Sequence, residues 1–348
     1  MDISRHLKVL MNSTSIVAKQ SSYPSGLRFE PRVISGFRPV REPHLGLHFG
    51  VLQHVIGEQD RRPGSSYSLI ADWHAVTAWF GRHDLQQATL ATAAALLALG
   101  INPNKTFLFV QSQVAALGEM AWLLSCMTPE SILLRNTVAD SSALNKNNIG
   151  AVLYPVLMAA DVLSIRGTKV VIARDQIVNG HKIRQIARAA NRVLEGPVFP
   201  VPSMLVRDEA GQSQNAAECD AERQIPIFRG LRELSERIRQ IPTGSQGPRE
   251  PKNPDTCTIF RLYAKTASAD QVQEMRSRYI NGQIGYEEAK RELVIAIVER
   301  FSLAVESFQE WQKRPDDLRD VLRNGASAVA GEVSATVVLV REKLGLAL

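Results

Sequence analysis

The chain has 348 residues and a mass of 38.4 kDa, which is enough for one large domain and a smaller one. Hydrophobic residues make up 45% and charged residues 22%, a composition that excludes a mainly disordered chain. The three cysteines are too few and too scattered for a disulfide scaffold or a metal centre, so we expect a reducing compartment. The net charge of +6 is compatible with a polyanionic partner but does not require one. No apolar run is long enough for a membrane helix.

The first 30 residues differ from the rest of the chain. They are rich in serine and basic residues, and Asp2 is the one acidic residue before Glu30. A long apolar core is missing, which argues against a secretory signal. We interpret residues 1–30 as a disordered or loosely docked extension and expect a cytoplasmic protein. The same composition also describes an organelle transit peptide, so import stays open as an alternative.

Short apolar runs alternate with helical patterns between residues 31 and 205. The runs typical of strands are 32–36, 67–71, 106–110 and 169–173. Helices are expected at about 46–57, 84–99 with Asp84 as N-cap, 114–126, 148–163 and 175–191. This alternation predicts an α/β fold, with a Rossmann-like parallel sheet and helices on both faces. Ligands bind beyond the carboxyl ends of such strands, which directs attention to 36–50, 72–77 and 173–176.

The last third is helical and differs in character. Helices are expected from residue 229 onward, with long ones near 271–279, 286–312 and 316–346, and a loop rich in Pro and Gly at 242–254 forms a hinge or connector. We therefore divide the chain into four consecutive regions. These are an extension (1–30), a Rossmann-like domain (31–205), a loop region (206–228) and a helical C-terminal domain (229–348).

The strongest local feature follows the first predicted strand. Ile34-Ser35-Gly36-Phe37-Arg38-Pro39 is followed by His44-Leu45-Gly46-Leu47-His48-Phe49-Gly50. A strand, a turn containing glycine and a helix N-terminus form a phosphate cradle, because free backbone N–H groups and the helix dipole favour anions. Taken alone, this pattern also describes a surface turn with two histidines.

Three further blocks strengthen the signal. They are Asp72-Trp73-His74-Ala75-Val76-Thr77, Tyr154-Pro155-Val156-Leu157-Met158-Ala159-Ala160-Asp161-Val162-Leu163, and Asp175-Gln176 with His181. In this order and spacing the blocks resemble the tryptophanyl-tRNA synthetases, a family of class I aminoacyl-tRNA synthetases, from about Val33 to the C-terminus. The resemblance implies a homodimer, no membrane association and no tightly bound cofactor. It also implies activation of L-tryptophan, or a related indole amino acid, by ATP with Mg²⁺, and tRNA as acceptor.

The resemblance assigns a tryptophan pocket. Asp161 would accept the indole N–H, and the chemistry fits, because indole only donates and a buried acceptor selects ligands that carry a donor. A salt bridge is the commoner fate of an aspartate. Met158, Val162 and Ile34 would line the slot, where Met158 could equally be a core residue and the family often has an aromatic residue in place of Ile34. Tyr154 and Gln176 would hold the amino group, and His74 would flank the pocket, with a packed or capping histidine as the alternative.

The resemblance also assigns a nucleotide site. Gly36, Phe37, Arg38, His44 and Gly46 would form the ATP cradle, and Asp175 would meet the ribose. The residues expected to act in catalysis are His44, Gly46 and Ser213.

Both catalytic signatures of the family are degraded. Leu47 stands where the first signature has a polar residue, and Val40-Arg41 replaces a Thr/Ser-Gly pair. The second signature normally reads Lys-Met-Ser-Lys-Ser, but the stretch from 207 to 215 contains no lysine and only Ser213 matches. Losing one such preorganised donor typically lowers the rate by about 10²–10³-fold. Arg41, Arg207 or another basic residue, such as Arg174 near the expected phosphates, would have to substitute.

The expected ATP site departs from the family pattern, whereas the expected tryptophan pocket is retained. Three hypotheses follow from this difference. The first is an enzyme that activates L-tryptophan with ATP, for tRNA or another acceptor, as a slow synthetase or a divergent paralogue. The second is a protein that binds tryptophan or an indole compound without turnover. The third is an RNA-binding relative that uses the helical region and the basic excess. We favour the adenylate-forming ligase, because the residues of the tryptophan pocket are retained.

Overall fold

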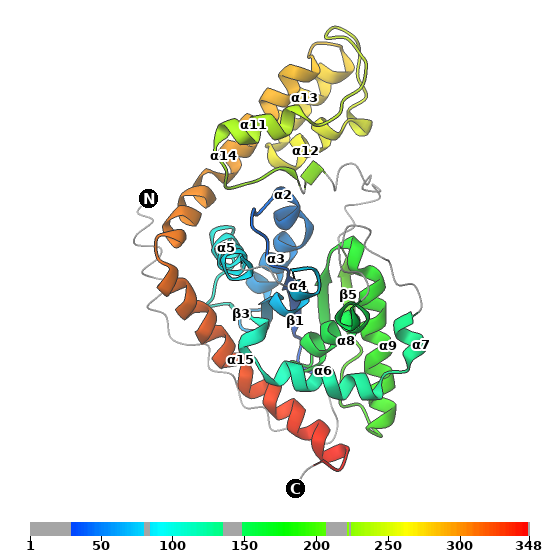
Figure 1. The fold of residues 1–348 in the computed structure, drawn as a ribbon. Coiled ribbons are helices and arrows are strands. Elements are labelled where there is room, and N and C mark those ends of the chain that lie inside the picture. Colours follow the sequence, from blue (N-terminus) through cyan, green and yellow to red (C-terminus); the bar gives the residue numbers. More distant parts are fainter. Residues whose placement is uncertain (1–28, 80–83, 135–147, 207–220, 223, 347–348) are drawn as a thin grey trace. The chain divides into compact units, whose positions relative to one another are not determined.

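The computed structural model describes residues 29–79, 84–134, 148–206, 221–222 and 224–346 (Figure 1). The strands are β1 (Val33–Phe37), β2 (Ser66–Ile70), β3 (Thr106–Val110), β4 (Lys169–Ile172) and β5 (Ser203–Val206). The helices up to β5 are α2 (Leu45–Leu47), η1 (His48–Leu52), α3 (Gln53–Arg61), α4 (Asp72–Trp79), α5 (Leu85–Ala98), η2 (Gln111–Gln113), α6 (Ala116–Met127), α7 (Glu130–Leu134), α8 (Ile149–Leu163), η3 (Arg174–Gln176) and α9 (Ile177–Val193). The later helices are α11 (Leu231–Arg239), η4 (Pro254–Thr256), α12 (Thr258–Thr266), α13 (Ala269–Ile280), α14 (Tyr286–Gln312) and α15 (Pro315–Lys343).

The five strands form one parallel sheet in the order β3-β2-β1-β4-β5. This confirms the predicted α/β class, and the four predicted strands lie within one or two residues of the observed ones. The fifth strand, β5, was not predicted. The chain order reverses between β1 and β4, which makes this junction the topological switch point of the sheet.

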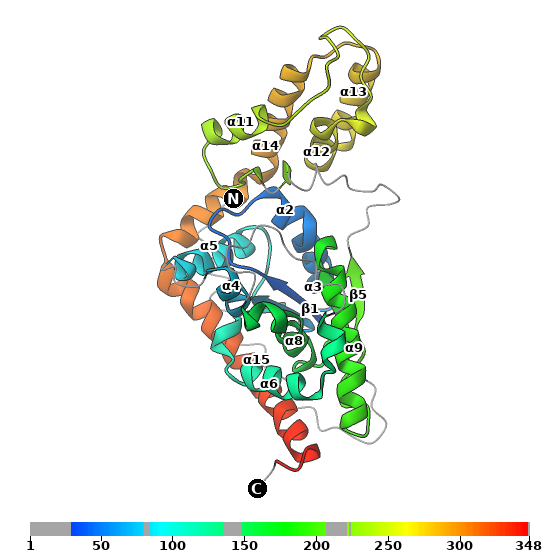
Figure 2. The ribbon, with the colours of Figure 1, turned by 45° about the vertical axis from the view of Figure 1, so that its right-hand side comes forward.

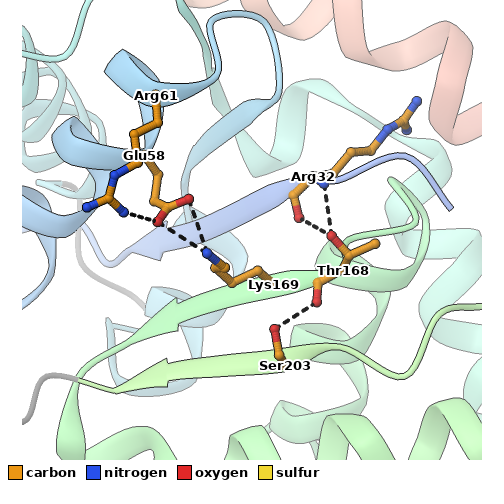
Figure 3. Close-up of polar contacts among 6 residues, drawn as sticks. All are labelled: Arg32, Glu58, Arg61, Thr168, Lys169 and Ser203. Atoms are coloured by element: carbon orange, nitrogen blue, oxygen red, sulfur yellow. Dashed lines mark hydrogen bonds and ion pairs between the residues drawn. The ribbon is translucent and has the colours of Figure 1, made fainter.

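Polar contacts fasten the strands together at their amino ends (Figure 3). The backbone N–H of Arg32 donates to Thr168 Oγ1 at 3.0 Å, and the Ser203 hydroxyl donates to the Thr168 carbonyl at 3.1 Å. The buried Glu58 carboxylate accepts from Lys169 Nζ with both oxygens at 3.2 Å and also pairs with Arg61. The amino end of the sheet is therefore closed by structural contacts, and the carboxyl end is the end that carries the predicted site segments.

The main core lies on one face of the sheet. It takes alternate strand residues, such as Tyr67 and Leu69 on β2, together with the apolar sides of α6, α8, α9 and α15. Helices α8 and α9 lie side by side in both views (Figures 1 and 2). The intervening β2 residues, Ser68 and Ile70, point to the opposite face, where α3 and α5 contact β2. Helices cover both faces, as predicted.

The described residues group into two compact units that are not consecutive along the chain. The first draws on Met1–Arg41, Gln53–Arg207 and Arg314–Leu348, and the second on Glu42–Leu52 and Asp208–Lys313. The sequence pattern assigns the last helix, α15, to the helical C-terminal domain, but this helix packs against β3 in the first unit. The cause is its apolar stripe, which includes Ala326, Val329 and Val333 and completes the core of the sheet.

Asp84 occupies the N-cap position of α5, as predicted. We expected Asp84 to cap α5 through its side chain, but it makes no capping hydrogen bond. Its carboxylate instead pairs with Arg41, from the turn after β1. The same turn is fastened by the Val40 N–H, which donates to Thr92 Oγ1 on α5 at 2.8 Å. The residue stands at the N-cap, and its carboxylate takes part in a tertiary ion pair rather than in a capping hydrogen bond.

Some predictions lie outside the described residues. These include nearly all of the N-terminal extension and most of the loop region, including Arg207 and Ser213. Within the described chain, no helix is long and apolar enough to cross a membrane.

Helix α15 approaches β3 so closely that it should tolerate no side chain at Gly325. A Cβ at this position would lie 1.9 Å from the Leu108 carbonyl oxygen. We expect Gly325→Ala to push α15 away from the sheet and lower the free energy of unfolding by about 1–3 kcal/mol or more, measured by urea denaturation. Gly331→Ala is the matched control, because nothing lies within 4 Å of a Cβ there on the same helix. Equal stability of the two variants would contradict the close approach.

Candidate active site

Three buried polar side chains meet in the first unit. The Gln111 Nε2 donates to Asp161 Oδ1 at 2.7 Å, and the same amide lies 3.1–3.2 Å from His74 Nδ1. The distance from His74 Nδ1 to Asp161 Oδ2 is 3.8 Å. None of the three residues is more than 4% exposed. They come from α4, η2 and α8, so the fold assembles the cluster from segments that are remote in sequence.

The sheet explains how two of these residues meet. His74 lies in the first turn of α4, just after β2, and Gln111 follows directly on β3. Because β2 and β3 are parallel neighbours, their carboxyl ends lie side by side. Asp72 links the segments that follow β2 and β3, because its Oδ1 accepts from the backbone N–H groups of Trp73 and Ser112, both at 3.0 Å.

Burial sets the charge states in the cluster. Desolvation raises the pKa of Asp161 well above its usual range; the hydrogen bond from Gln111 opposes this, and the nearby charge of Asp72 adds to it. Desolvation lowers the pKa of His74 to about 4, so its imidazole is neutral at physiological pH. A neutral imidazole and a carboxyl group that resists ionisation favour a ligand that brings a neutral hydrogen-bond donor.

The predicted pocket residues on α8 share one side of the helix. Tyr154, Met158 and Asp161 are spaced by four and three residues, which places them on neighbouring turns. The Tyr154 ring packs edge-on against His74, with centroids 4.3 Å apart and planes at 76°. Tyr154 and Met158 are half-buried. The structure therefore brings together Asp161, His74 and Tyr154 and leaves partly exposed apolar surface beside them.

Two further predicted wall residues are deep in the core. Ile34 and Val162 are 1% and 2% exposed, and both side chains lie around Gly167. A Cβ at Gly167 would lie 2.0 Å from Ile34 Cδ1 and 3.0 Å from Val162 Cγ1. Their assignment to the pocket wall stays a prediction. Gln176 is half-buried on η3, and its Oε1 accepts from Asn179 Nδ2 at 2.9 Å.

The first part of the predicted ATP cradle is the end of β1. Gly36 is exposed, and a Cβ there would meet only Leu69 Cγ at 3.9 Å, so the backbone is open to a ligand on this side. The Phe37 side chain is buried, and its carbonyl accepts from the Ala71 N–H at 2.8 Å. Arg38 and Asp175 are exposed.

The second part of the cradle belongs to the other unit. His44 precedes α2 and forms a bridge with Pro226, and the Leu45 N–H donates to the Ile225 carbonyl at 3.0 Å. Gly46 lies in α2, which continues as a π-helical turn, His48–Leu52, before α3. The units thus divide His44 and Gly46 from Gly36, Phe37 and Arg38.

His48 is a candidate to replace the polar residue that the family has at the position of Leu47. His48 is adjacent in sequence, but its ring is buried and packs edge-on against Phe49 and Phe301, with centroids 4.9 and 5.0 Å away. This side chain fills the core of the second unit. It therefore does not replace the group lost at Leu47.

Gln111 is the residue that sequence reasoning missed. It lies in none of the blocks that carry the resemblance, and glutamine has no fixed role that a local pattern would reveal. The available signal was its position directly after the third predicted strand, at the carboxyl edge where ligands bind in parallel sheets.

Comparison with known proteins identifies the family of the chain. The family model for tRNA synthetases class I (W and Y) matches residues 28–302. A tryptophan--tRNA ligase of Fusobacterium nucleatum is 32% identical over 321 residues, covering 90% of this chain and 98% of that protein. A tryptophan--tRNA ligase of Rhodopirellula baltica is also 32% identical, covering 88% of this chain and 97% of that protein.

A solved structure gives the same answer for the fold. The tryptophanyl-tRNA synthetase of Campylobacter jejuni, complexed with ADP and tryptophan, is 29% identical, with a TM-score of 0.79 over 90% of this chain and 100% of that chain. The family model covers well over half of the sequence, and the F. nucleatum relative is more than 30% identical and matches 90% of this chain. The chain therefore belongs to the class I tRNA synthetases of the tryptophan and tyrosine group and is a tryptophanyl-tRNA-synthetase-like protein.

Proposed function

We propose that this protein binds L-tryptophan and activates it with ATP to tryptophanyl adenylate. The observation that carries the proposal is the buried Gln111–Asp161–His74 cluster. Gln111 occupies Asp161 Oδ1, and no described residue donates a hydrogen bond to Oδ2. An indole N–H would fill that position, and Tyr154, packed on His74, would border the amino acid.

The reaction follows from the ligand chemistry of the family. A carboxylate oxygen of tryptophan bonds to the α-phosphorus of ATP, the bond from that phosphorus to its bridging oxygen breaks, and pyrophosphate leaves. The tryptophanyl group then passes to a ribose hydroxyl of tRNA, and AMP leaves. The relatives named tryptophan--tRNA ligase support tRNA as acceptor. The residues of this chain would bind and orient the two substrates.

The described residues fit a nucleotide. Gly36 leaves its backbone open at the carboxyl edge of the sheet, and the exposed Asp175 at the end of β4 would accept from the ribose hydroxyls. No group of three or more metal-ligating side chains occurs among the described residues. Mg²⁺ needs no such group when it binds mainly through substrate phosphates and water.

One observation favours a second candidate, a protein that holds tryptophan without turnover. The stretch from 207 to 215 has no lysine, and His48 is buried and unable to compensate for Leu47. Such a protein would keep the indole cluster and lack the transition-state charge that activation needs.

Pyrophosphate exchange separates the two candidates. We expect exchange between ATP and labelled pyrophosphate that depends on L-tryptophan and is about 10²-fold or more slower than that of the F. nucleatum ligase assayed alongside, because the lysines are missing. Charging of tRNA is then measured on the same preparation. Tight tryptophan binding by calorimetry without any exchange at high enzyme concentration would overturn the activation and support the second candidate.

Asp161 should set the preference for indole. The protein should bind L-tryptophan about 10–100-fold more tightly than its benzothiophene analogue, which lacks the N–H, and Asp161→Ala should remove that preference. Asp161→Asn serves as a folding control. Because burial raises the pKa of Asp161, ionisation of this group costs folding free energy above the usual carboxyl range. The Asn variant should therefore melt no lower than the native protein at pH 8. An unchanged preference in the Ala variant would contradict this role.

We also propose a homodimer, as the family resemblance implies. Helices α6, α7 and α8 each expose a large apolar side chain: Trp122 is 68%, Leu134 57% and Ile149 72% exposed. Light scattering should give twice 38.4 kDa, and Trp122→Glu should shift the protein towards the monomer. Leu303→Glu, at a 71% exposed site on α14, is the control and should leave the dimer intact. A native monomer, or dissociation by the control alone, would refute this interface.

A further inference from the structure

Helix α9 carries an unbalanced charge. Its 17 residues, Ile177–Val193, include four lysines and arginines but no aspartate or glutamate. One of the four, Lys182, is buried. The other three, Arg184, Arg188 and Arg192, follow one another at intervals of four residues. They therefore form an arginine row on one side of the helix, with a step of about 6 Å along its axis.

The arginine row faces away from the core. Helix α9 packs on α8 and β4, and its opposite side, which includes Ile186 and Ala190, belongs to the main core (Figure 2). Arg188 and Arg192 are exposed, and Arg184 is half-buried. The row is therefore a surface of the first unit that a partner can reach.

Other helices of the chain neutralise their exposed arginines within the helix. Arg232 pairs with Glu236 on α11, and Arg323 pairs with Asp320 on α15. In the part of the chain that the structure describes, no residue of the arginine row forms an ion pair or a side-chain hydrogen bond, and the buried Nε of Arg184 has no acceptor. Like charges four residues apart destabilise a helix, so the row is stabilised when an anion binds along it.

The surroundings of the row favour a nucleic acid over a protein or a membrane. Partner proteins and membrane surfaces are held by apolar anchors among the charges. On α9 the one large exposed apolar side chain is Val193, the last residue of the helix, which is 52% exposed. A regular line of cations without apolar anchors matches the repeating charge of a phosphate backbone.

The position of α9 connects the row to the candidate site. The helix begins directly after η3, which follows β4 at the carboxyl end of the sheet. The Gln111–Asp161–His74 cluster lies at the same end. A long polyanion that reaches this end of the sheet can therefore continue along α9.

We propose that the arginine row of α9 binds the phosphate backbone of RNA, independently of its sequence. The inference rests on the proposed function only in naming tRNA as that RNA. Arginine suits the task because its guanidinium stays charged and binds phosphate oxygens in pairs.

Fluorescence anisotropy with the full-length protein tests the row. The labelled probes are a transcript of a tryptophan tRNA and an unrelated RNA duplex, each titrated at several salt concentrations. We expect Arg188→Gln and Arg192→Gln each to weaken binding about 3-fold, and the double variant about 10-fold, at about 100 mM salt. The slope of log affinity against log salt should fall by about 1 for each arginine removed. Both probes should lose affinity equally, because phosphate contacts carry no sequence information.

Arg323→Gln is the matched control. Arg323 is an exposed arginine on α15 of the same unit, and its removal changes the net charge equally, but its guanidinium is already paired with Asp320. The RNA affinity of this variant should change by less than about 2-fold. Affinity for L-tryptophan and pyrophosphate exchange should keep their native values in all variants, because the substituted residues lie outside the candidate site.

The outcomes separate the row from the proposed function. The row is overturned if the native protein binds neither probe, if the double variant keeps its affinity and salt slope, or if Arg323→Gln causes an equal loss. Displacement of the probes by poly-L-glutamate as effectively as by unlabelled RNA would assign the row to an acidic protein and overturn the RNA surface. A selective loss of RNA affinity in a protein without pyrophosphate exchange would support the row while refuting activation.

Discussion

A carboxyl group buried without a cation is the constraint on which the candidate site depends. Asp161 is 4% exposed, and the amide of Gln111 is the one described side chain that donates to it. Burying an ionisable group is costly unless hydrogen bonds compensate, so this position would be unfavourable in a protein with no use for it. The hydrogen bond from Gln111 offsets part of this cost, and it forms only when α4, η2 and α8 are all in place.

The parallel sheet provides that geometry by treating its two ends differently. At the amino end, Thr168 and the Glu58–Lys169 pair hold the central strands together (Figure 3). At the carboxyl end, the ladder between β1 and β4 stops early, and polar and charged side chains follow the strands. The contacts at the amino end keep the sheet rigid. The carboxyl end can therefore hold polar and charged side chains in fixed positions for a ligand.

The departures from the family signatures lie in the proposed nucleotide site and not in the proposed tryptophan pocket. Gln111, Asp161 and His74 form a buried hydrogen-bonded cluster, whereas His48 packs in a core with Phe301 and Arg41 forms an ion pair with Asp84. Arg38 and Arg174, which follow β1 and β4, are both exposed.

Features set by residues close in sequence were predicted well, and features set by residues distant in sequence were not. Periodicity placed β1 to β4 and the long helices correctly, because hydrophobic spacing is a local property. Local patterns did not foresee what a distant partner decided: Asp84 stands at the N-cap of α5, but its carboxylate pairs with Arg41 and makes no capping hydrogen bond. The strand β5 was missed as well, because its four residues are half-exposed at the sheet edge and show little alternation.

The sequence by itself determined the family, the α/β class and the presence of Asp161 on an apolar helix, since these follow from motifs and local patterning. Tertiary structure alone decided which groups Asp161 meets, because Gln111 reaches it from 50 residues away through a neighbouring strand. It also decided that Arg41 pairs with Asp84, because that contact joins two segments that are distant in sequence. Charge and hydrogen-bond partners are relations between distant segments, and they come into existence only when the sheet brings those segments together.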